Sequence, residues 1–139
     1  MAKVVNIFLV RHGEAAASWG EDPDPGLSSG GRQQALAVRD ELESYRDLTL
    51  ISSPLLRAQE TAQPLATALR TSLVLDDRYR EIPSPSGIDR RAWLTQLMKE
   101  NWEDQDEELQ AWRDAAWSGL FEIDGPTAIF THFMVCLLY

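Results

Sequence analysis

Val4-Val-Asn-Ile-Phe-Leu-Val-Arg-His-Gly13 is the stretch that decides the fold. Its apolar part, Val4 to Val10, is interrupted only by Asn6 and stops at Arg11-His12. The run is too short to span a membrane, and no small-residue cleavage site follows it, so we interpret it as a buried strand rather than a signal peptide. The cytoplasm is therefore the expected location.

Two later runs have the same apolar, β-branched character, at Leu48–Ile51 and Thr127–Phe130. Continuous runs of this length are typical of strands buried on both faces of a parallel sheet that helices cover. The sequence therefore predicts an α/β fold, a three-layer α/β/α arrangement with a mainly parallel central sheet.

Helical patterns separate these strands. Apolar side chains recur every three or four residues from Ala35 to Tyr45, and Ser28 or Ser29 can cap that helix. A second helix is predicted after Ser53-Pro54, with Ser53 as its N-cap, and it continues through Leu69. Proline lacks the helical donor, so we expect a kink or a restart at Pro64.

The second half of the chain predicts a loop over Arg78–Gly87 and two helices, near Asp89–Lys99 and Gln105–Leu120. The tryptophans of this region are expected to pack in the core: Trp93, Trp102, Trp112 and Trp117. No linker long enough to divide two domains is visible. We expect a single domain over residues 1–139, with about 82–122 as a helical lid.

Composition limits the classes of partner. The formal net charge of −9 disfavours attraction to nucleic acid or to an anionic membrane surface, so a small anionic substrate needs a local positive site. Much of the acidic excess lies in Glu100–Glu108, which we interpret as a solvated loop and helix start. The lone Cys136 excludes an internal disulfide and is expected to be a small core residue.

Polar motifs follow each of the three predicted strands. Arg11-His12 follows the first strand, Ser52–Arg57 follows the second, and Thr131-His132 follows the last. The carboxyl ends of strands in open α/β sheets build binding sites, so two histidines and two arginines should converge there. Two guanidiniums with planar paired donors match a phosphate dianion, and the helix start after Ser53 adds backbone donors.

Such surroundings suit a histidine nucleophile. Neighbouring positive charges should depress the pKa of His12, which keeps the imidazole neutral. A backbone carbonyl is the expected acceptor for one ring nitrogen, so that the other presents its lone pair to phosphorus. His132 is expected to donate to a phosphoryl oxygen as charge develops. This chemistry requires neither a metal nor another cofactor.

Glu81 is the candidate proton donor for the leaving group. Nearby arginines would lower its pKa, whereas burial and substrate charge would raise it. The alternative is a surface glutamate that pairs with Arg78 or Arg80.

The sequence resembles the histidine phosphatase superfamily, also called the phosphoglycerate mutase-like family. Its Arg-His-Gly signature is Arg11-His12-Gly13, followed by Glu14. Two further elements of the family stand at Leu27–Ala35, Leu-Ser-Ser-Gly-Gly-Arg-Gln-Gln-Ala, and at Ser52–Ala62, Ser-Ser-Pro-Leu-Leu-Arg-Ala-Gln-Glu-Thr-Ala. The three in order make a strong match over about residues 3–69.

The resemblance implies a phosphate pocket and a covalent intermediate. Its pocket residues are Arg11, His12, Arg57 and His132, with His12 becoming phosphohistidine. It also supports Glu81, which stands in the Arg80-Glu81-Ile82 context. The second family histidine is commonly followed by glycine, whereas Phe133 stands here.

The family fold usually continues beyond that histidine with a helix and at least one strand. We therefore expect a truncated or frameshifted chain that lacks them. Seven residues are too few for a stable helix without packing. This interpretation implies exposed apolar surface near the carboxyl end, or pairing with another copy of the chain to form a homo-oligomer.

The favoured function is metal-independent hydrolysis of small phosphate monoesters. Three alternatives remain: a phosphoglycerate mutase-type phosphoryl transfer, a protein-phosphohistidine phosphatase, and a noncatalytic domain that binds a phosphorylated ligand. Several side chains lie where a lid could contact the leaving group, although a solvated loop and helix face explain them equally well: Ser84, Ser86, Arg90, Arg91 and Trp93.

Overall fold

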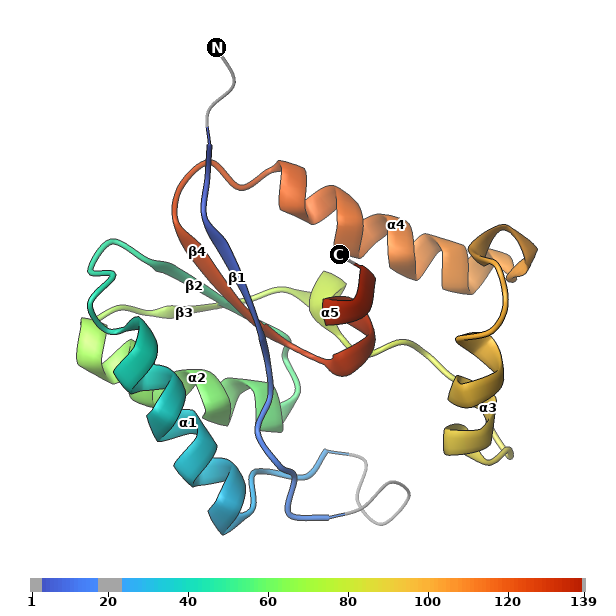
Figure 1. The fold of residues 1–139 in the computed structure, drawn as a ribbon, viewed down its shortest axis with the longest axis horizontal. Coiled ribbons are helices and arrows are strands. Elements are labelled where there is room, and N and C mark those ends of the chain that lie inside the picture. Colours follow the sequence, from blue (N-terminus) through green and yellow to red (C-terminus); the bar gives the residue numbers. More distant parts are fainter. Residues whose placement is uncertain (1–3, 18–23, 139) are drawn as a thin grey trace.

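A four-stranded parallel sheet forms the centre of the fold, with helices on both of its faces (Figure 1). The computed structural model describes residues 4–17 and 24–138. The strand order is β1-β4-β2-β3. The strands are β1 Ile7–Arg11, β2 Thr49–Ser52, β3 Leu73–Leu75 and β4 Thr127–Thr131. The predicted α/β class and the three predicted strands are confirmed, with ends that shift by up to three residues.

Strand β3 is absent from the sequence-based prediction. It has three residues at an edge of the sheet, where Val74 is 52% and Leu75 51% exposed. Its three apolar residues are fewer than the run of about four to eight by which a strand is recognised in a sequence.

Helices α1 and α2 cover one face. Helix α1, Ser29–Leu42, is capped as predicted, because the Ser28 hydroxyl accepts from the Gly31 amide at 3.0 Å. The predicted N-cap of α2, Leu56–Leu69, is wrong. Its N-cap is Leu55, and the Leu56 amide donates instead to the Asp24 carboxylate at 2.8 Å.

Pro64 lies inside α2. Of the kink or restart predicted there, the restart does not occur, because the helix continues as one element through Leu69. A proline removes one helical hydrogen bond. The next two residues, Leu65 and Ala66, are buried against the sheet, and this packing holds the helix together across the missing bond.

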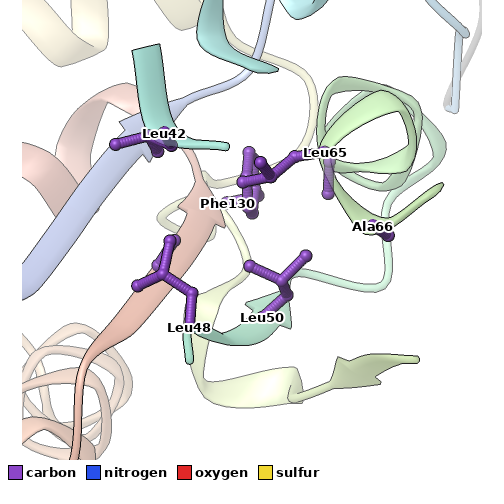
Figure 2. Packing of buried hydrophobic residues seen from close by; sticks show 8 residues of the cluster. Leu42, Leu48, Leu50, Leu65, Ala66 and Phe130 are labelled. Atoms are coloured by element: carbon purple, nitrogen blue, oxygen red, sulfur yellow. The ribbon is translucent and has the colours of Figure 1, made fainter. Parts of the chain in front are cut away.

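The core on this face lies between α1, α2 and the sheet. Figure 2 shows its side chains converging from both helices and from β2 and β4, and the labelled members are Leu42, Leu48, Leu50, Leu65, Ala66 and Phe130. Leu50, Leu65 and Phe130 have no exposed surface. Full burial of such side chains stabilises a fold by about 1.5–3 kcal/mol each.

The opposite face is covered by α4, Glu107–Phe121, and α5, Phe133–Leu138 (Figure 1). The last helix has only six residues, but Met134 and Val135 are buried, so it has the packing that so short a helix needs. Between η1, Asp77–Tyr79, and α4 lie α3, Arg90–Leu97, and η2, Trp102–Asp104. The loop and both helices predicted for this region are confirmed.

Three of the four tryptophans pack as predicted. Trp93, Trp102 and Trp112 lie against the cluster formed by Ile82, Leu94, Leu97, Leu109 and Met134. The prediction is wrong for Trp117, which is 41% exposed and contacts Phe121 edge-on at 5.8 Å between ring centroids.

Among the described residues, no helix is long and apolar enough to cross a membrane.

Two neighbouring glycines at the start of α1 differ in what a methyl group would contact. A Cβ at Gly31 would overlap the Glu14 backbone oxygen, whereas a Cβ at Gly30 would meet nothing nearer than 3.8 Å. We expect Gly31→Ala to lower the free energy of unfolding by about 1–3 kcal/mol, because the loop after His12 must move away from α1. Gly30→Ala, the control, should be neutral or slightly stabilising. Urea unfolding of both variants measures the difference, and equal stabilities would contradict the close contact.

Candidate active site

The carboxyl ends of β1, β4 and β2 lie side by side, and the polar residues that follow them meet there. The His12 amide donates to the Thr131 carbonyl at 2.9 Å, and the Ser53 amide donates to the Phe130 carbonyl at 2.9 Å. His12 and His132 thus leave adjacent strands, and their rings lie edge to face with centroids 5.1 Å apart. The convergence of the two histidines is the arrangement that parallel strand ends produce.

The hydrogen bonds of His12 define its tautomer. Nδ1 lies 2.7 Å from the Gly13 carbonyl, which can only accept, so Nδ1 carries the proton. Nε2 receives the Arg57 Nε–H at 3.3 Å, so Nε2 carries the lone pair. A backbone carbonyl therefore holds one nitrogen of His12, and the other keeps its lone pair.

The pKa of His12 falls from 6.5 to about 4. Burial is the largest cause, and the charges of Arg57 and Arg11 lower the pKa further, while the bond to Gly13 opposes them. The direction matches the sequence-based expectation, but that expectation named charge alone and left out burial. His12 is neutral at pH 7.

Arg57 reaches His12 from the first turn of α2. Hydrogen bonds of Thr61 tie the loop after β1 to this helix. The Thr61 hydroxyl accepts from the Gly13 amide at 2.9 Å and donates to the Arg57 carbonyl at 2.7 Å. One buried threonine therefore fixes the Arg-His-Gly loop against the helix that carries Arg57. Thr61 is a supporting residue that the sequence motif contained but to which we assigned no role.

His132 has no exposed surface, and its two ring nitrogens differ. Nε2 lies 2.8 Å from the Ser53 hydroxyl, whereas Nδ1 is buried with no hydrogen-bond partner among the described residues. Burial, then the charges of Arg57 and His12, lower the pKa of His132 to about 2. Buried polar atoms are almost always paired, so the lone Nδ1 points to a hydrogen bond that a ligand would complete.

Neutral, buried His132 should make the fold sensitive to acid. Unfolding raises its pKa to about 6.5, so below that pH the unfolded chain binds one more proton, and stability falls as pH falls. We expect a loss of about 1.4 kcal/mol per pH unit between roughly pH 6 and pH 4 from this residue. Urea unfolding measures the slope. His132→Gln should reduce the slope by that amount, and an unchanged slope would contradict the burial of a neutral ring.

Glu81 is joined to the residue that follows it and to the first turn of α5. Its Oε1 accepts from the Ile82 amide at 3.0 Å and from the Met134 amide at 3.2 Å. Burial raises the pKa of Glu81, and the two amide bonds and the charges of Arg90 and Arg57 only partly oppose it. The surface alternative is wrong, since Arg78 pairs with Asp76 and Glu122, and Arg80 pairs with Asp77.

The remaining site candidates lie in different places. Arg11 is exposed, and its guanidinium carbon lies 5.1 Å from the centre of the Phe133 ring. Arg90 donates to the Ser84 hydroxyl at 2.6 Å, and its charge lowers the pKa of both Arg57 and His132. Trp93 packs on the cluster around Ile82.

Asp24 is a residue at the site that the sequence analysis missed. Its carboxylate caps α2 at Leu56, and its charge raises the pKa of Arg57. An aspartate between two prolines looks like any turn residue in the sequence, so no signal there could have found it.

Among the described residues, no group of three or more His, Cys, Asp or Glu side chains could hold a metal ion.

Comparison with known proteins gives a family and several relatives. The sequence model of the histidine phosphatase superfamily, branch 1, matches residues 7–122. Phosphoserine phosphatase 1 of Hydrogenobacter thermophilus is 31% identical over 115 residues, which cover 78% of this chain and 51% of that protein. Probable phosphoglycerate mutase GpmB of Salmonella paratyphi C is 33% identical over 85 residues, which cover 57% of this chain and 39% of that protein. The chain spans about half or less of these relatives' length.

Solved structures show the same fold. The structure of TTHB049 from Thermus thermophilus aligns with a TM-score of 0.66 and 26% identity, over 95% of this chain and 81% of that one. A structure named Mycobacterial hydrolase 1 aligns with a TM-score of 0.70 and 22% identity, over 94% of this chain and 74% of that one. The three-layer architecture is therefore shared with these proteins.

Proposed function

Because the chain belongs to the histidine phosphatase superfamily, branch 1, we propose that it hydrolyses phosphate monoesters through a phosphohistidine formed on His12. One observation carries this proposal: His12 is neutral and presents the lone pair of Nε2 toward the Arg57 guanidinium. A neutral imidazole with one fixed tautomer is the form that attacks phosphorus.

The proposed phosphate pocket consists of Arg11, Arg57 and His132 around the Nε2 atom of His12. Guanidiniums offer paired donors that match phosphoryl oxygens. The buried Nδ1 of His132 lacks a partner among the described residues, and a phosphoryl oxygen would supply one. These donors hold the phosphoryl group in line with Nε2 and stabilise the charge that develops on its oxygens during transfer.

The reaction has two steps. In the first, the Arg57 Nε–H leaves Nε2 for a phosphoryl oxygen, which frees the Nε2 lone pair. The N–P bond to Nε2 then forms, the bond from phosphorus to the ester oxygen breaks, and Glu81 gives its proton to the departing alkoxide. In the second, water attacks phosphorus, Glu81 takes a proton from the water, and the N–P bond breaks. Burial raises the pKa of Glu81, and this supports a protonated form at the start of the first step.

The proposal is tested by turnover and by trapping. Purified protein with a chelating agent should release phosphate from an aryl phosphate, and rapid quenching with labelled substrate should leave a phosphoryl group on His12 that is labile in acid and stable in base. Turnover without such an intermediate would contradict the role of His12, and loss of turnover in chelator would contradict the metal-independent route.

The role of Glu81 predicts a dependence on the leaving group. Glu81→Gln removes the proton but keeps a similar shape, so turnover of an alkyl phosphate should fall by about 10²–10⁴-fold. Release of nitrophenol from a nitrophenyl phosphate in the first turnover, where the leaving group needs little help from an acid, should slow much less. Leaving-group release before the shared second step is measured for both substrates, and equal losses there would remove Glu81 from protonation of the leaving group.

The proposed substrates are small phosphate esters. Phosphoserine and phosphoglycerate, the substrates in the relatives' names, each carry a carboxylate near the phosphate. Arg90 is the candidate to contact such a group, because its charge acts on both Arg57 and His132. A panel of phosphoglycerates, phosphoserine, sugar phosphates, nucleotides and phosphohistidine peptides should show the highest kcat/KM for the carboxylate-bearing esters.

A mutase activity is the second candidate, favoured by the relatives named as phosphoglycerate mutases. It would pass the phosphoryl group from phosphohistidine to a second hydroxyl instead of to water. Incubation with phosphoglycerate separates the two, because a mutase interconverts the isomers whereas a phosphatase releases inorganic phosphate. A noncatalytic domain, the alternative of another class, would bind phosphate and show neither product.

A further inference from the structure

The side chain of Glu81 is held through one of its two oxygens. Both amide donors, Ile82 at 3.0 Å and Met134 at 3.2 Å, reach Oε1. One donor is the next residue of the chain and the other lies in α5, more than fifty residues away. The two bonds therefore tie the loop that carries Glu81 to the last helix.

The two donors are fixed relative to each other by the core. Ile82 is 1% and Met134 4% exposed, and both belong to one apolar cluster with Leu94, Leu97 and Leu109. A displacement of either amide would open this packed cluster. The position of Oε1 is thus set by buried side chains on α3, α4 and α5 and in the loop before α3.

Met134 lies in the first turn of α5, where backbone N–H groups have no acceptor within the helix. The Cys136 amide closes that turn by donating to the His132 carbonyl at 3.1 Å. His132 thus precedes the turn of α5 in which the Met134 amide donates to Glu81. The short helix α5 is therefore bonded to Glu81, the proposed proton donor, and follows directly on His132, the proposed charge-stabilising group.

We propose that the first turn of α5 is a positioning element for the proton donor: the Met134 amide, with that of Ile82, keeps Oε1 as an acceptor and makes Oε2 the oxygen that carries the proton. The inference rests on the proposed function of Glu81. An oxygen that already accepts two N–H bonds is the less basic of the pair, so the proton resides on the other one.

Other charged and titratable groups act on Glu81 as well. Arg57 on α2 and Arg90 on α3 lower its pKa, and Cys136 on α5 experiences its charge. The bonds from the Ile82 and Met134 amides also favour the carboxylate form of Glu81. The apolar cluster holds both donors in place. Removal of the Met134 N–H should therefore raise the pKa of Glu81, because a bond that stabilises its charged form is lost.

The first test uses hydrogen exchange at the Met134 amide. Glu81→Gln keeps a carbonyl-type oxygen that can accept both amides, whereas Glu81→Ala removes the acceptor. We expect exchange at Met134 to be faster by about threefold to tenfold in Glu81→Ala and close to the wild-type rate in Glu81→Gln. Equal exchange in the two variants would overturn the proposal.

The second test removes the donor. Met134→Pro lacks the N–H, and Met134→Ala is its control, because it also loses the buried side chain but keeps the N–H. With carbon-13 labelled glutamate carboxyls, Glu81 should titrate at a higher pH in Met134→Pro than in Met134→Ala. In the first turnover, release of an alkyl leaving group should be slower by at least a further factor of about ten in the proline variant, while release of nitrophenol should not.

The results separate the inference from the function on which it rests. Equal Glu81 titration in the two Met134 variants overturns the positioning role even where the wild-type protein is an active phosphatase. An inactive wild-type protein overturns the function, whatever the exchange shows. If Met134→Pro does not fold, the exchange rates of the two Glu81 variants decide the matter alone.

Discussion

His12→Ala is expected to abolish hydrolysis of phosphate esters, with a loss of about 10⁴-fold or more in kcat. His132 cannot take its place. The only other histidine, His132, is fully buried, with Nε2 on Ser53. The loss should be the same for good and poor leaving groups, since both reactions require the N–P bond. Steady-state rates on nitrophenyl and alkyl phosphates measure it.

Two controls distinguish a lost nucleophile from a lost fold. His12→Ala should unfold in urea near the wild-type midpoint, because the His12 ring has hydrogen bonds, within residues 4–17 and 24–138, only to Gly13 next to it and to Arg57. Labelled substrate should leave no acid-labile phosphoryl group on the variant. A variant that retained more than about one hundredth of the wild-type rate would show that another group attacks phosphorus.

Arg57→Ala is the second change with a large expected effect. The guanidinium is a proposed phosphate ligand, and its Nε–H lies 3.3 Å from the nucleophilic nitrogen. We expect kcat/KM to fall by about 10³-fold, since charge on the transferring phosphoryl group would lose a preorganised donor. Arg57→Lys should recover only part of the loss, because lysine keeps the charge but not the paired planar donors.

Arg57→Ala should also move the acid limb of the pH profile of kcat/KM. Hydrolysis requires neutral His12, so kcat/KM should decline as pH falls toward the pKa of about 4. Arg57 lowers that pKa, and its removal should therefore move the decline to higher pH, whereas Arg57→Lys should leave it near the wild-type position. The comparison uses one substrate throughout, so that the ionisation of the substrate cancels. An acid limb that stays in place in Arg57→Ala would contradict the electrostatic coupling.

Much of the fold follows from local pattern. The runs around Ile7, Leu50 and Ile129 predicted β1, β2 and β4, because strands buried on both faces must be apolar throughout. The start of α1 followed from a serine that caps its first turn. Strand β3 was missed because an apolar run of three residues is too short to identify a strand. The true start of α2 could not be predicted, since its cap comes from the distant Asp24.

The candidate site divides in the same way. His12, Arg57 and His132 could be found from the sequence because each follows a recognisable strand, and parallel strands bring their carboxyl ends together. The sequence by itself thus determined which groups meet and that His12 should be neutral. Only the tertiary structure decided the tautomer of His12, the depth of burial that lowers its pKa most, and the bond between Glu81 and the Met134 amide. Those properties depend on atoms that are far apart in the chain, and only folding sets their distances and removes the surrounding water.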